Sequence, residues 1–185
     1  MKNCLFLLLI FASFFTLAQP ISQEELNKKK TFTSLLDANK TPSEVYKLNL
    51  SSKDLKDLPE DIQKFSNLQI LDVSKNDLIE LPASITQLKN LEILNVNDNA
   101  ISVLPFNIGD LKNLKELSMH KNKLKELPDR FKQLQGLLKL DDYVNNLTKL
   151  PKHIGDLVHL IVIDFYVNEI YKLPASMANL HNVEA

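Results

Sequence analysis

The sequence predicts an α/β right-handed solenoid, shaped as a horseshoe, with parallel strands on its concave face. Short helical or 3₁₀ returns should form the convex face, and a helical cap should cover the N-terminal end. Two recurring features predict this architecture. Asparagine recurs every 23 residues, at Asn76, Asn99, Asn122, Asn145 and Asn168. Leu-Pro pairs recur at the same interval, at 58–59, 81–82, 104–105, 127–128, 150–151 and 173–174. A single unit of this length cannot bury its own apolar side, but stacked units can.

The first 18 residues have the pattern of a signal peptide. A short positive start ends at Asn3, and an almost unbroken apolar run covers residues 4–15. This run has the length of a signal-peptide core and is shorter than the roughly 20 residues that a membrane span needs. We therefore expect cleavage after Ala18. A membrane anchor or a buried N-terminal helix is the alternative.

The leader also predicts where the protein is found. A lipid-accepting cysteine directly follows an apolar run, whereas Cys4 precedes it. We therefore expect an exported, non-lipidated bacterial protein that is secreted, periplasmic or at the cell surface. The mature chain would contain no cysteine and no integral membrane span, so its core has to stabilise it without disulfides.

Residues 19–44 are predicted to form a helical cap on the first unit. Ser22 and Glu25 have the spacing of a capping box, which opens a helix. The apolar residues from Phe32 onward then predict one helix over residues 31–39. This helix would cover the apolar N-terminal end of the stack.

Six units of 23 residues cover residues 45–182 without insertion or deletion. They begin at Val45, Leu68, Leu91, Leu114, Leu137 and Leu160. In the second unit, Leu71 and Val73 alternate as a short strand with its apolar side inward. Pro82 then opens a return in which apolar residues three and four apart make a helical or 3₁₀ stripe. Such returns make successive strands parallel in a right-handed coil.

The recurring asparagines are predicted to be structural. Each follows a strand, where its side-chain amide can donate to and accept from turn backbone that would otherwise be buried without partners. The first unit has Lys53 at this position, so its turn should lack the amide.

These units resemble the leucine-rich repeat in its 23-residue form, LxxLxLxxNxLxxLPxxIxxLxN. The resemblance covers about three quarters of the chain, and similar units occur in Ras-suppressor-like scaffolds and in exported bacterial repeat proteins. It implies a curved solenoid whose concave face binds another macromolecule, here a protein or peptide partner. Such a resemblance says more about the fold than about the ligand.

Asp142 departs from the pattern because it occupies a core position. The other units have Leu50, Val73, Val96, Met119 and Phe165 there. A carboxylate in the core costs several kcal/mol unless it is paired or protonated. We expect the strand to rotate locally and turn Tyr143 inward. The alternatives are that Asp142 finds hydrogen-bond donors or acts as a catalytic acid.

The C-terminal end has no predicted cap. Residues 183–185 form a short tail after the sixth unit. An apolar interior left open at this end would favour pairing with another chain. A homodimer through this end is therefore one expectation, and the alternatives are fraying of the last unit and a shortened gene.

The concave face carries the candidate binding residues. Positions three, five and seven of each unit alternate with buried leucines and therefore face outward. The partner-binding candidates among them are Asp72, Asn95, Asn97, His120, Asp141, Tyr143, Asp164 and Tyr166. The C-terminal half of this face is aromatic and apolar, which is typical of interfaces. The alternative is that Tyr143 and Tyr166 only stack across neighbouring strands.

Composition and motifs argue against several other functions. With 22 basic and 23 acidic residues, the net charge of −1 leaves no basic surplus for binding nucleic acid. His120 beside Asp141 and Tyr143 is the single candidate base on the concave face, and no nucleophile or glycine-rich turn accompanies it. His153 and His159 lack the spacing of a zinc site. We therefore expect no enzymatic activity, no cofactor and no metal.

The sequence thus predicts a non-catalytic, exported module that presents its concave face to a macromolecular partner. A structural protein that self-associates through its C-terminal end is the alternative. An intracellular signalling scaffold would require that residues 1–18 are retained.

Overall fold

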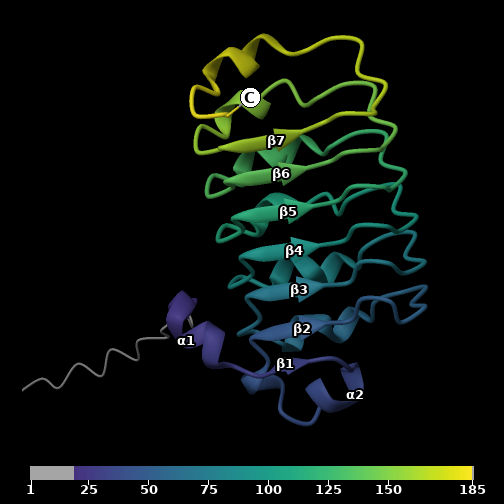
Figure 1. Cartoon of the computed structure of the whole chain (residues 1–185), viewed down its shortest axis with the longest axis vertical. Coiled ribbons are helices and arrows are strands. Elements are labelled where there is room, and N and C mark those ends of the chain that lie inside the picture. The colour runs from purple at the N-terminus through teal and green to yellow at the C-terminus, as the bar shows by residue number, and fades with distance from the viewer. Residues whose placement is uncertain (1–18, 185) are drawn as a thin grey trace, which may run out of the picture.

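The protein is a stack of parallel strands along one long axis (Figure 1). The computed structural model describes residues 19–184, so the predicted signal peptide at 1–18 lies outside the described part. The strands pair in chain order and are β1 (Thr31–Phe32), β2 (Lys47–Asn49), β3 (Ile70–Asp72), β4 (Ile93–Asn95), β5 (Glu116–Ser118), β6 (Lys139–Asp141) and β7 (Val162–Asp164). No helix within residues 19–184 is long and apolar enough to cross a membrane.

Neighbouring strands from β2 to β7 pair in parallel with a constant offset of 23 residues. Leu48 lies opposite Leu71, and Leu71 lies opposite Leu94. This register places equivalent residues of successive units side by side. It confirms the predicted solenoid of parallel strands.

Short 3₁₀ turns return the chain behind the sheet. They are η1 (Pro42–Glu44), η2 (Glu60–Lys64), η3 (Ala83–Gln87), η4 (Ile108–Asp110), η5 (Asp129–Gln133), η6 (Ile154–Asp156) and η7 (Ala175–Asn179). Pro59, Pro82 and Pro128 directly precede η2, η3 and η5. Proline suits this position because its missing N–H has no partner within the turn to lose.

Gly109 and Gly155 allow successive returns to pack directly on each other. A Cβ atom at Gly109 would lie 2.1 Å from the backbone oxygen of Arg130. A Cβ atom at Gly155 would lie 1.7 Å from the backbone oxygen of Ser176. A larger side chain would therefore push the next unit away.

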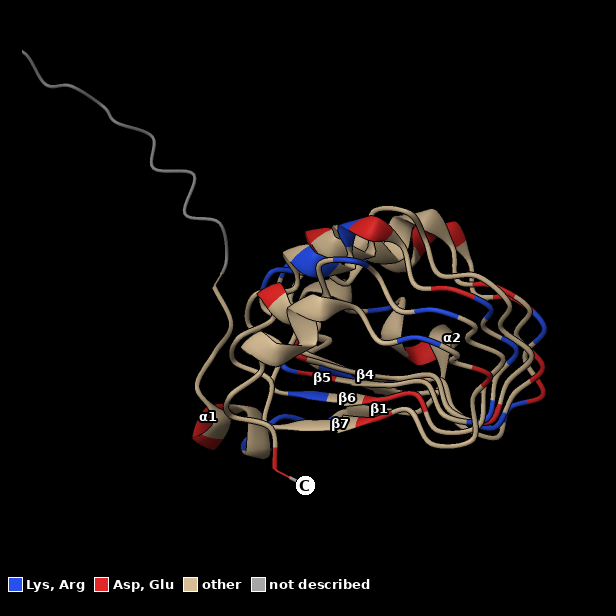
Figure 2. Cartoon of the chain, turned by 90° about the horizontal axis from the view of Figure 1, so that it is seen from above, with Lys and Arg blue, Asp and Glu red and all other residues tan. Residues whose placement is uncertain are grey.

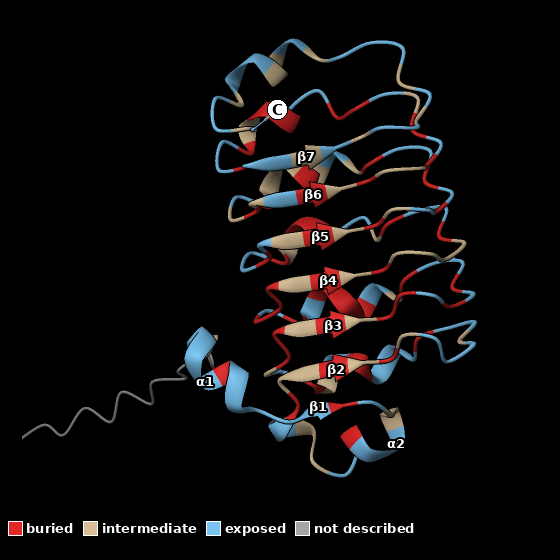
Figure 3. Cartoon of the chain, viewed as in Figure 1, coloured by how far each residue is buried: buried red, intermediate tan, exposed pale blue. Residues whose placement is uncertain are grey.

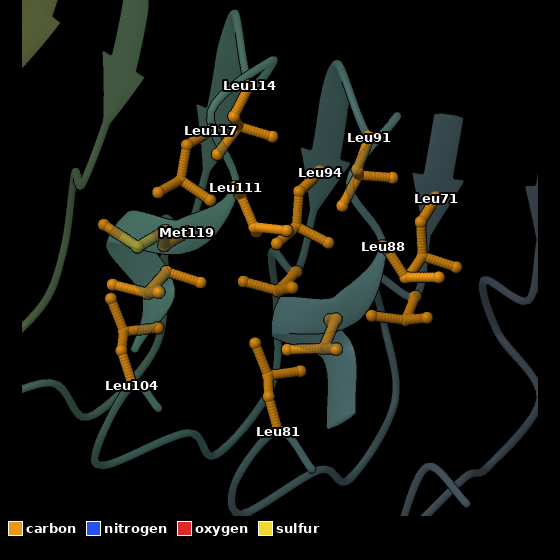
Figure 4. Close-up of a cluster of buried hydrophobic side chains, with 14 of the residues drawn as sticks. Leu71, Leu81, Leu88, Leu91, Leu94, Leu104, Leu111, Leu114, Leu117 and Met119 are labelled. Carbon is orange, nitrogen blue, oxygen red and sulfur yellow. The ribbon is translucent and has the colours of Figure 1, made fainter. Parts of the chain in front are cut away.

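The apolar side chains of every unit meet between the sheet and the 3₁₀ turns. Figure 4 shows Leu71, Leu94 and Leu117 from three neighbouring strands in one layer with Leu88 and Leu111 from the returns. Each of these five leucines is at most 1 % exposed. Figure 3 shows the buried middle residue repeated from β2 to β6. This continuous core stabilises units that could not fold alone.

The recurring asparagines tie each turn to its neighbours. The Asn122 amide donates to the backbone oxygens of Val96 at 3.0 Å and Met119 at 2.9 Å. Its Oδ1 accepts from the backbone N–H of Ile101 at 3.0 Å. Corresponding bonds are made by Asn76, Asn99, Asn145 and Asn168. The turn backbone is thereby satisfied inside the protein.

The first unit obtains the same bonds from the second. The backbone N–H of Lys53, at the asparagine position of the first unit, donates to Asn76 Oδ1 at 2.9 Å. The backbone N–H of Leu55 donates to the same oxygen at 3.0 Å. The next unit supplies this amide as it does in the later turns, and Lys53 itself contributes none.

The N-terminal cap differs from the predicted helix over residues 31–39. Thr31–Phe32 forms β1, which pairs in parallel with β2 and places Phe32 opposite Leu48. The helix α2 (Leu35–Ala38) begins only after this strand. The prediction was wrong because extended backbone lets Phe32, which is 6 % exposed, enter the core beside the strand leucines. The sheet therefore has seven strands rather than six.

The helix α1 (Gln23–Lys28) lies beside the N-terminal end of the sheet (Figure 1). Its predicted capping box is present, with Ser22 Oγ accepting from Glu25 N–H and the Glu25 carboxylate accepting from Ser22 N–H. The Gln69 side chain holds the segment before the helix. It donates to Ile21 O at 3.1 Å and accepts from Ile21 N–H at 3.0 Å.

The sixth unit is more exposed than the units before it. Ile163 in β7 is half-buried, whereas the corresponding leucines of β2 to β6 are buried. Leu180 and Val183 pack against the core from the C-terminal side and are also half-buried.

Candidate functional site

The solvent-facing side of the sheet, here called the concave face, carries the candidate residues. In β2 to β5 the middle residue is buried and the residues on both sides of it are half-buried. This alternation places the predicted binding residues along one face: Asp72, Asn95, Asn97, His120, Asp141, Tyr143, Asp164 and Tyr166.

Four of these residues have a structural task at the strand ends. Each accepts through Oδ1 from the backbone N–H two residues later, at 2.9 Å for Asp72, 3.1 Å for Asn95, 3.2 Å for Asp141 and 2.7 Å for Asp164. This bond closes an Asx turn. The turn explains why Asp or Asn occupies this position, and no ligand is needed to explain it. The recurrence of Asp or Asn at this position of the unit is visible in the sequence.

A chain of side-chain hydrogen bonds crosses the middle of the concave face. Asn97 Nδ2 donates to Ser118 Oγ at 3.0 Å, and Ser118 Oγ donates to Asp141 Oδ2 at 3.1 Å. Asn97 Oδ1 also accepts from the backbone N–H of His120 at 2.8 Å. Ser118 links three neighbouring units, yet it was not predicted as a site residue because a lone serine has no distinctive sequence signal.

His120 lies on this face without side-chain hydrogen bonds to its predicted neighbours. Its Nδ1 is enclosed and has no hydrogen-bond partner among residues 19–184. In that part of the chain, no group of three or more His, Cys, Asp or Glu side chains is arranged to hold a metal ion.

Tyr143 and Tyr166 form the aromatic centre of the C-terminal half of the face. Their ring centroids are 5.9 Å apart and their planes differ by 9°, so the rings stack across neighbouring units. Tyr166 is 72 % exposed, and Val162, four residues earlier on β7, is also exposed. The stack therefore presents a rigid aromatic surface to solvent.

Val144 and Val167 follow the two tyrosines in a left-handed backbone conformation. Each has a φ of 56°, a region that β-branched residues avoid because Cβ crowds the backbone. Earlier units have Ser52, Lys75, Asp98 and Lys121 at this position. Such strain costs about 1–2 kcal/mol per residue and concentrates at functional sites. Here the strained residues add apolar surface beside the tyrosines.

Carboxylates border this aromatic surface. Asp164 and Glu169 are exposed, and Asp141 is half-buried. None of these three forms an ion pair with another residue of the described segment 19–184. Their negative charge is therefore available to a partner.

Asp142 stays in the core, contrary to the predicted strand rotation. The pairing of β6 with β7 is unbroken, and Asp142 is 0 % exposed. Rotation does not occur because it would turn the buried leucine of the same strand outward. Asn145 Nδ2 donates to Asp142 Oδ1 at 3.0 Å, and Oδ2 has no partner among residues 19–184. Burial, followed by the charge of Asp141, raises the pKa of Asp142 to about 8, so the carboxyl group is mainly protonated at neutral pH.

Comparison with known proteins agrees with this architecture. A family model described as a leucine-rich repeat region matches residues 46–142. The structure of a leucine-rich repeat protein from Leptospira interrogans is similar, with 28 % sequence identity and a TM-score of 0.50. The similarity covers 84 % of this chain and 57 % of that one, so the chain spans little more than half of that protein. No curated protein matches this sequence.

The family match extends over more than half of the chain, and the structure shows the same repeat throughout the sheet. Leucine-rich repeat regions commonly serve as protein-interaction modules and are generally non-catalytic. The constant strand register, the asparagine bonds and the matched family model together show that this chain belongs to the leucine-rich repeat family.

Proposed function

We propose that this chain is an exported, non-catalytic protein that binds a macromolecular partner on the C-terminal half of its concave face. The binding surface would be the tyrosine patch, defined as Tyr143, Val162, Tyr166 and Val167. The stacked, solvent-facing pair of Tyr143 and Tyr166 carries this proposal. Stacked tyrosines offer a large rigid contact area with little conformational entropy to lose on binding.

The surroundings of the tyrosine patch favour a protein segment that has an apolar side chain next to lysine or arginine. The apolar side chain would pack on the tyrosine rings and the exposed valines. Asp141, Asp164 and Glu169 would attract the cation, and the tyrosine faces add a cation–π attraction. A partner with this chemistry would be recognised without a deep pocket.

Strain beside the patch supports a role in binding. Val144 and Val167 keep a backbone conformation that lysine, serine or aspartate occupies in the other units. A valine is the costlier residue there. The apolar valine side chain would contribute to the binding surface. This contribution is a reason for valine to occur in the two units that also carry the tyrosines.

Export is supported by the leader pattern alone. If residues 1–18 are removed, the mature protein begins at Gln19. N-terminal sequencing of the protein from its native host tests this directly. An intact Met1 on protein from the cytoplasm would contradict export and favour the scaffold alternative.

A peptide selection tests the binding surface. A displayed library of random peptides is selected on the natively processed protein, and the Kd of the best peptide is measured. We expect the double variant Tyr143→Ala, Tyr166→Ala to weaken binding at least about tenfold, because exposed aromatic anchors dominate such contacts. The matched control is Tyr171→Ala, which removes an equally exposed tyrosine outside the concave face. Equal Kd values for the wild type and the double variant would contradict the proposed surface.

Self-association through the C-terminal end is a second candidate. It is favoured by the half-exposed Ile163, Leu180 and Val183, whose counterparts in inner units are buried. Pairing of this end with a second copy would bury that surface. Leu180→Asp should then convert a dimer to a monomer, whereas the tyrosine double variant should leave it a dimer.

A further inference from the structure

A second exposed surface, here called the lateral face, lies where the chain runs from the strand ends to the 3₁₀ turns. It is formed by residues 56–61, 79–84, 102–107, 125–130, 148–153 and 171–176. Figure 2, which looks down the stack, shows acidic and basic residues gathered on this side. The exposed large apolar side chains on it are Ile79, Val103, Phe106, Tyr171 and Leu173.

Two neighbouring grooves hollow the lateral face. One of about 1010 Å³ extends over units three to six, and one of about 340 Å³ extends over units one to three. Val103 and Phe106 line both grooves, so the two grooves meet at these residues, and the pair of grooves is here called the trough. Phe106 is 69 % exposed, and the Arg130 guanidinium lies 5.5 Å from its ring centroid.

Charge along the trough changes sign from one end to the other. Its N-terminal end is lined by the acidic Glu60 and Glu80, and its C-terminal end by the basic Lys152 and Lys172. Glu80, Lys152 and Lys172 are exposed and form no ion pair within residues 19–184. Their charges are free to act on a partner molecule.

Most charges at the centre of the trough are paired within the chain. Glu126 pairs with Lys149 at 3.4 Å. Arg130 pairs with Asp110 at 3.7 Å and covers the Phe106 ring, whereas Asp129 forms no ion pair within residues 19–184. Among the residues that line the trough, the acidic Glu60 and Glu80 therefore lie at one end, the basic Lys152 and Lys172 at the other, and the apolar Val103 and Phe106 between them.

We propose that two copies of this chain associate through their lateral faces in antiparallel orientation. The two-fold axis would cross the troughs between units three and four. Unit two of one copy then faces unit five of the second, which places Glu80 opposite Lys152 of the second copy. Unit one faces unit six, which places Glu60 opposite Lys172 of the second copy, and symmetry repeats each contact.

The charge pattern selects this arrangement over the parallel one. A two-fold contact requires one surface to be complementary to itself. A face whose charge reverses along its length meets this requirement only when the two copies run in opposite directions, since parallel copies would place like charges together. The exposed Val103 and Phe106 of both copies would be buried at the centre.

This contact uses neither the tyrosine patch nor the outer edge of β7. Partner binding on the concave face can therefore fail while the lateral dimer persists, and the reverse also holds. The proposal also differs from end-to-end pairing through Leu180 and Val183. A charge exchange on the lateral face would not affect that contact.

Sedimentation velocity over a concentration series tests the lateral dimer on the natively processed protein. We expect a monomer–dimer equilibrium that weakens as ionic strength rises. Glu80→Lys alone and Lys152→Glu alone should each raise the dimer Kd at least about tenfold, because each brings like charges together. The combined variant should restore the Kd to within about threefold of the wild type. The matched control is Glu44→Lys, which reverses an exposed glutamate in η1, outside the lateral face.

Three results would overturn the proposal. One is a wild-type protein that stays monomeric at every concentration. Another is that Glu80→Lys and the control change the dimer Kd equally, or that the combined variant dimerises no more tightly than the single variants. The third is a dimer that Leu180→Asp dissociates while the charge reversals do not, which would assign the contact to the C-terminal end. Circular dichroism of each variant checks that the fold is intact.

Discussion

Asn145 donates from Nδ2 to the side chain of Asp142 at 3.0 Å, whereas the other recurring asparagines donate to a backbone oxygen three residues earlier. The Asp142 carboxyl group therefore takes the place of a backbone acceptor inside the core. Asp142 is fully buried, and one of its oxygens has no partner among residues 19–184. The arrangement holds the acid in an apolar position at an energetic cost that depends on pH.

The stability of the protein should fall as the pH rises from about 4 to about 8. In the unfolded chain Asp142 has its ordinary pKa of 3.8, and burial raises the pKa to about 8 in the folded chain. Between these values the folded state holds a proton that the unfolded state has lost. The free energy of unfolding should therefore fall by about 1.4 kcal/mol per pH unit and level off above about pH 8.

Asp142→Val restores the residue type of the other units and should remove this contribution. At pH 7 we expect the free energy of unfolding to rise by about 4 kcal/mol, since pH 7 lies about three units above the ordinary pKa of 3.8 and each unit costs about 1.4 kcal/mol. Urea unfolding at several pH values measures both effects. Asp142→Asn is the control that keeps the shape without titrating. A wild-type pH dependence retained in both variants would assign it to another group.

Replacing Val144 by asparagine should stabilise the protein. Asparagine tolerates the left-handed conformation that valine adopts there with a φ of 56°. We expect a gain of about 1 kcal/mol in urea unfolding. Lys75→Asn, at the same position of the second unit, is the control and should gain less than about 0.5 kcal/mol, because lysine is not β-branched. Equal gains would show that the strain at Val144 is small.

Asn122→Ala should be strongly destabilising. The change removes the donors to Val96 O and Met119 O and the acceptor of Ile101 N–H. Each buried backbone group left without a partner costs about 1–3 kcal/mol, so we expect a loss of at least about 3 kcal/mol. Asn146→Ala changes an exposed asparagine in the same kind of turn and should cost less than about 0.5 kcal/mol. Similar midpoints in urea for both variants would show that water replaces the lost bonds.

Gly155→Ala should separate two neighbouring units. Its Cβ would lie 1.7 Å from the backbone oxygen of Ser176, which cannot move without shifting η7. Overpacking of this kind costs about 1–3 kcal/mol or more. At Gly136 the nearest atom to a Cβ is Lys112 O at 3.3 Å, so Gly136→Ala should be milder. Thermal unfolding ranks the two variants, and the reverse order would contradict this packing argument.

The position of the N-terminal cap and the conformation of Asp142 show where local pattern was insufficient. Phe32 has a helical spacing with Leu35 and Leu36, yet it extends the sheet because Leu48 offers an apolar neighbour in register. Asp142 is polar, yet the pairing of β6 with β7 on one side and β5 on the other keeps it inward. In both cases the contacts with the neighbouring unit outweigh the preference of the residue itself.

The candidate surfaces also contain features that the sequence predicted and features that it did not. Alternation along a strand placed Tyr166 on the outward face, whereas the rotation expected at Asp142 would have turned Tyr143 inward. The sequence did not reveal the strain at the following valines, since φ depends on the turn that the asparagines hold together.

By itself the sequence determined the repeat length, the parallel register, the buried leucines and the structural asparagines, because each depends on spacing within and between units. Only the tertiary structure decided that Glu60 and Glu80 line one groove and Lys152 and Lys172 the groove next to it. It also decided that the carboxyl group of Asp142 remains in the core. The grooves depend on side chains that lie far apart in the sequence and meet only when the units stack. The position of Asp142 depends on a single residue whose cost of burial is outweighed by the packing of the rest of its strand.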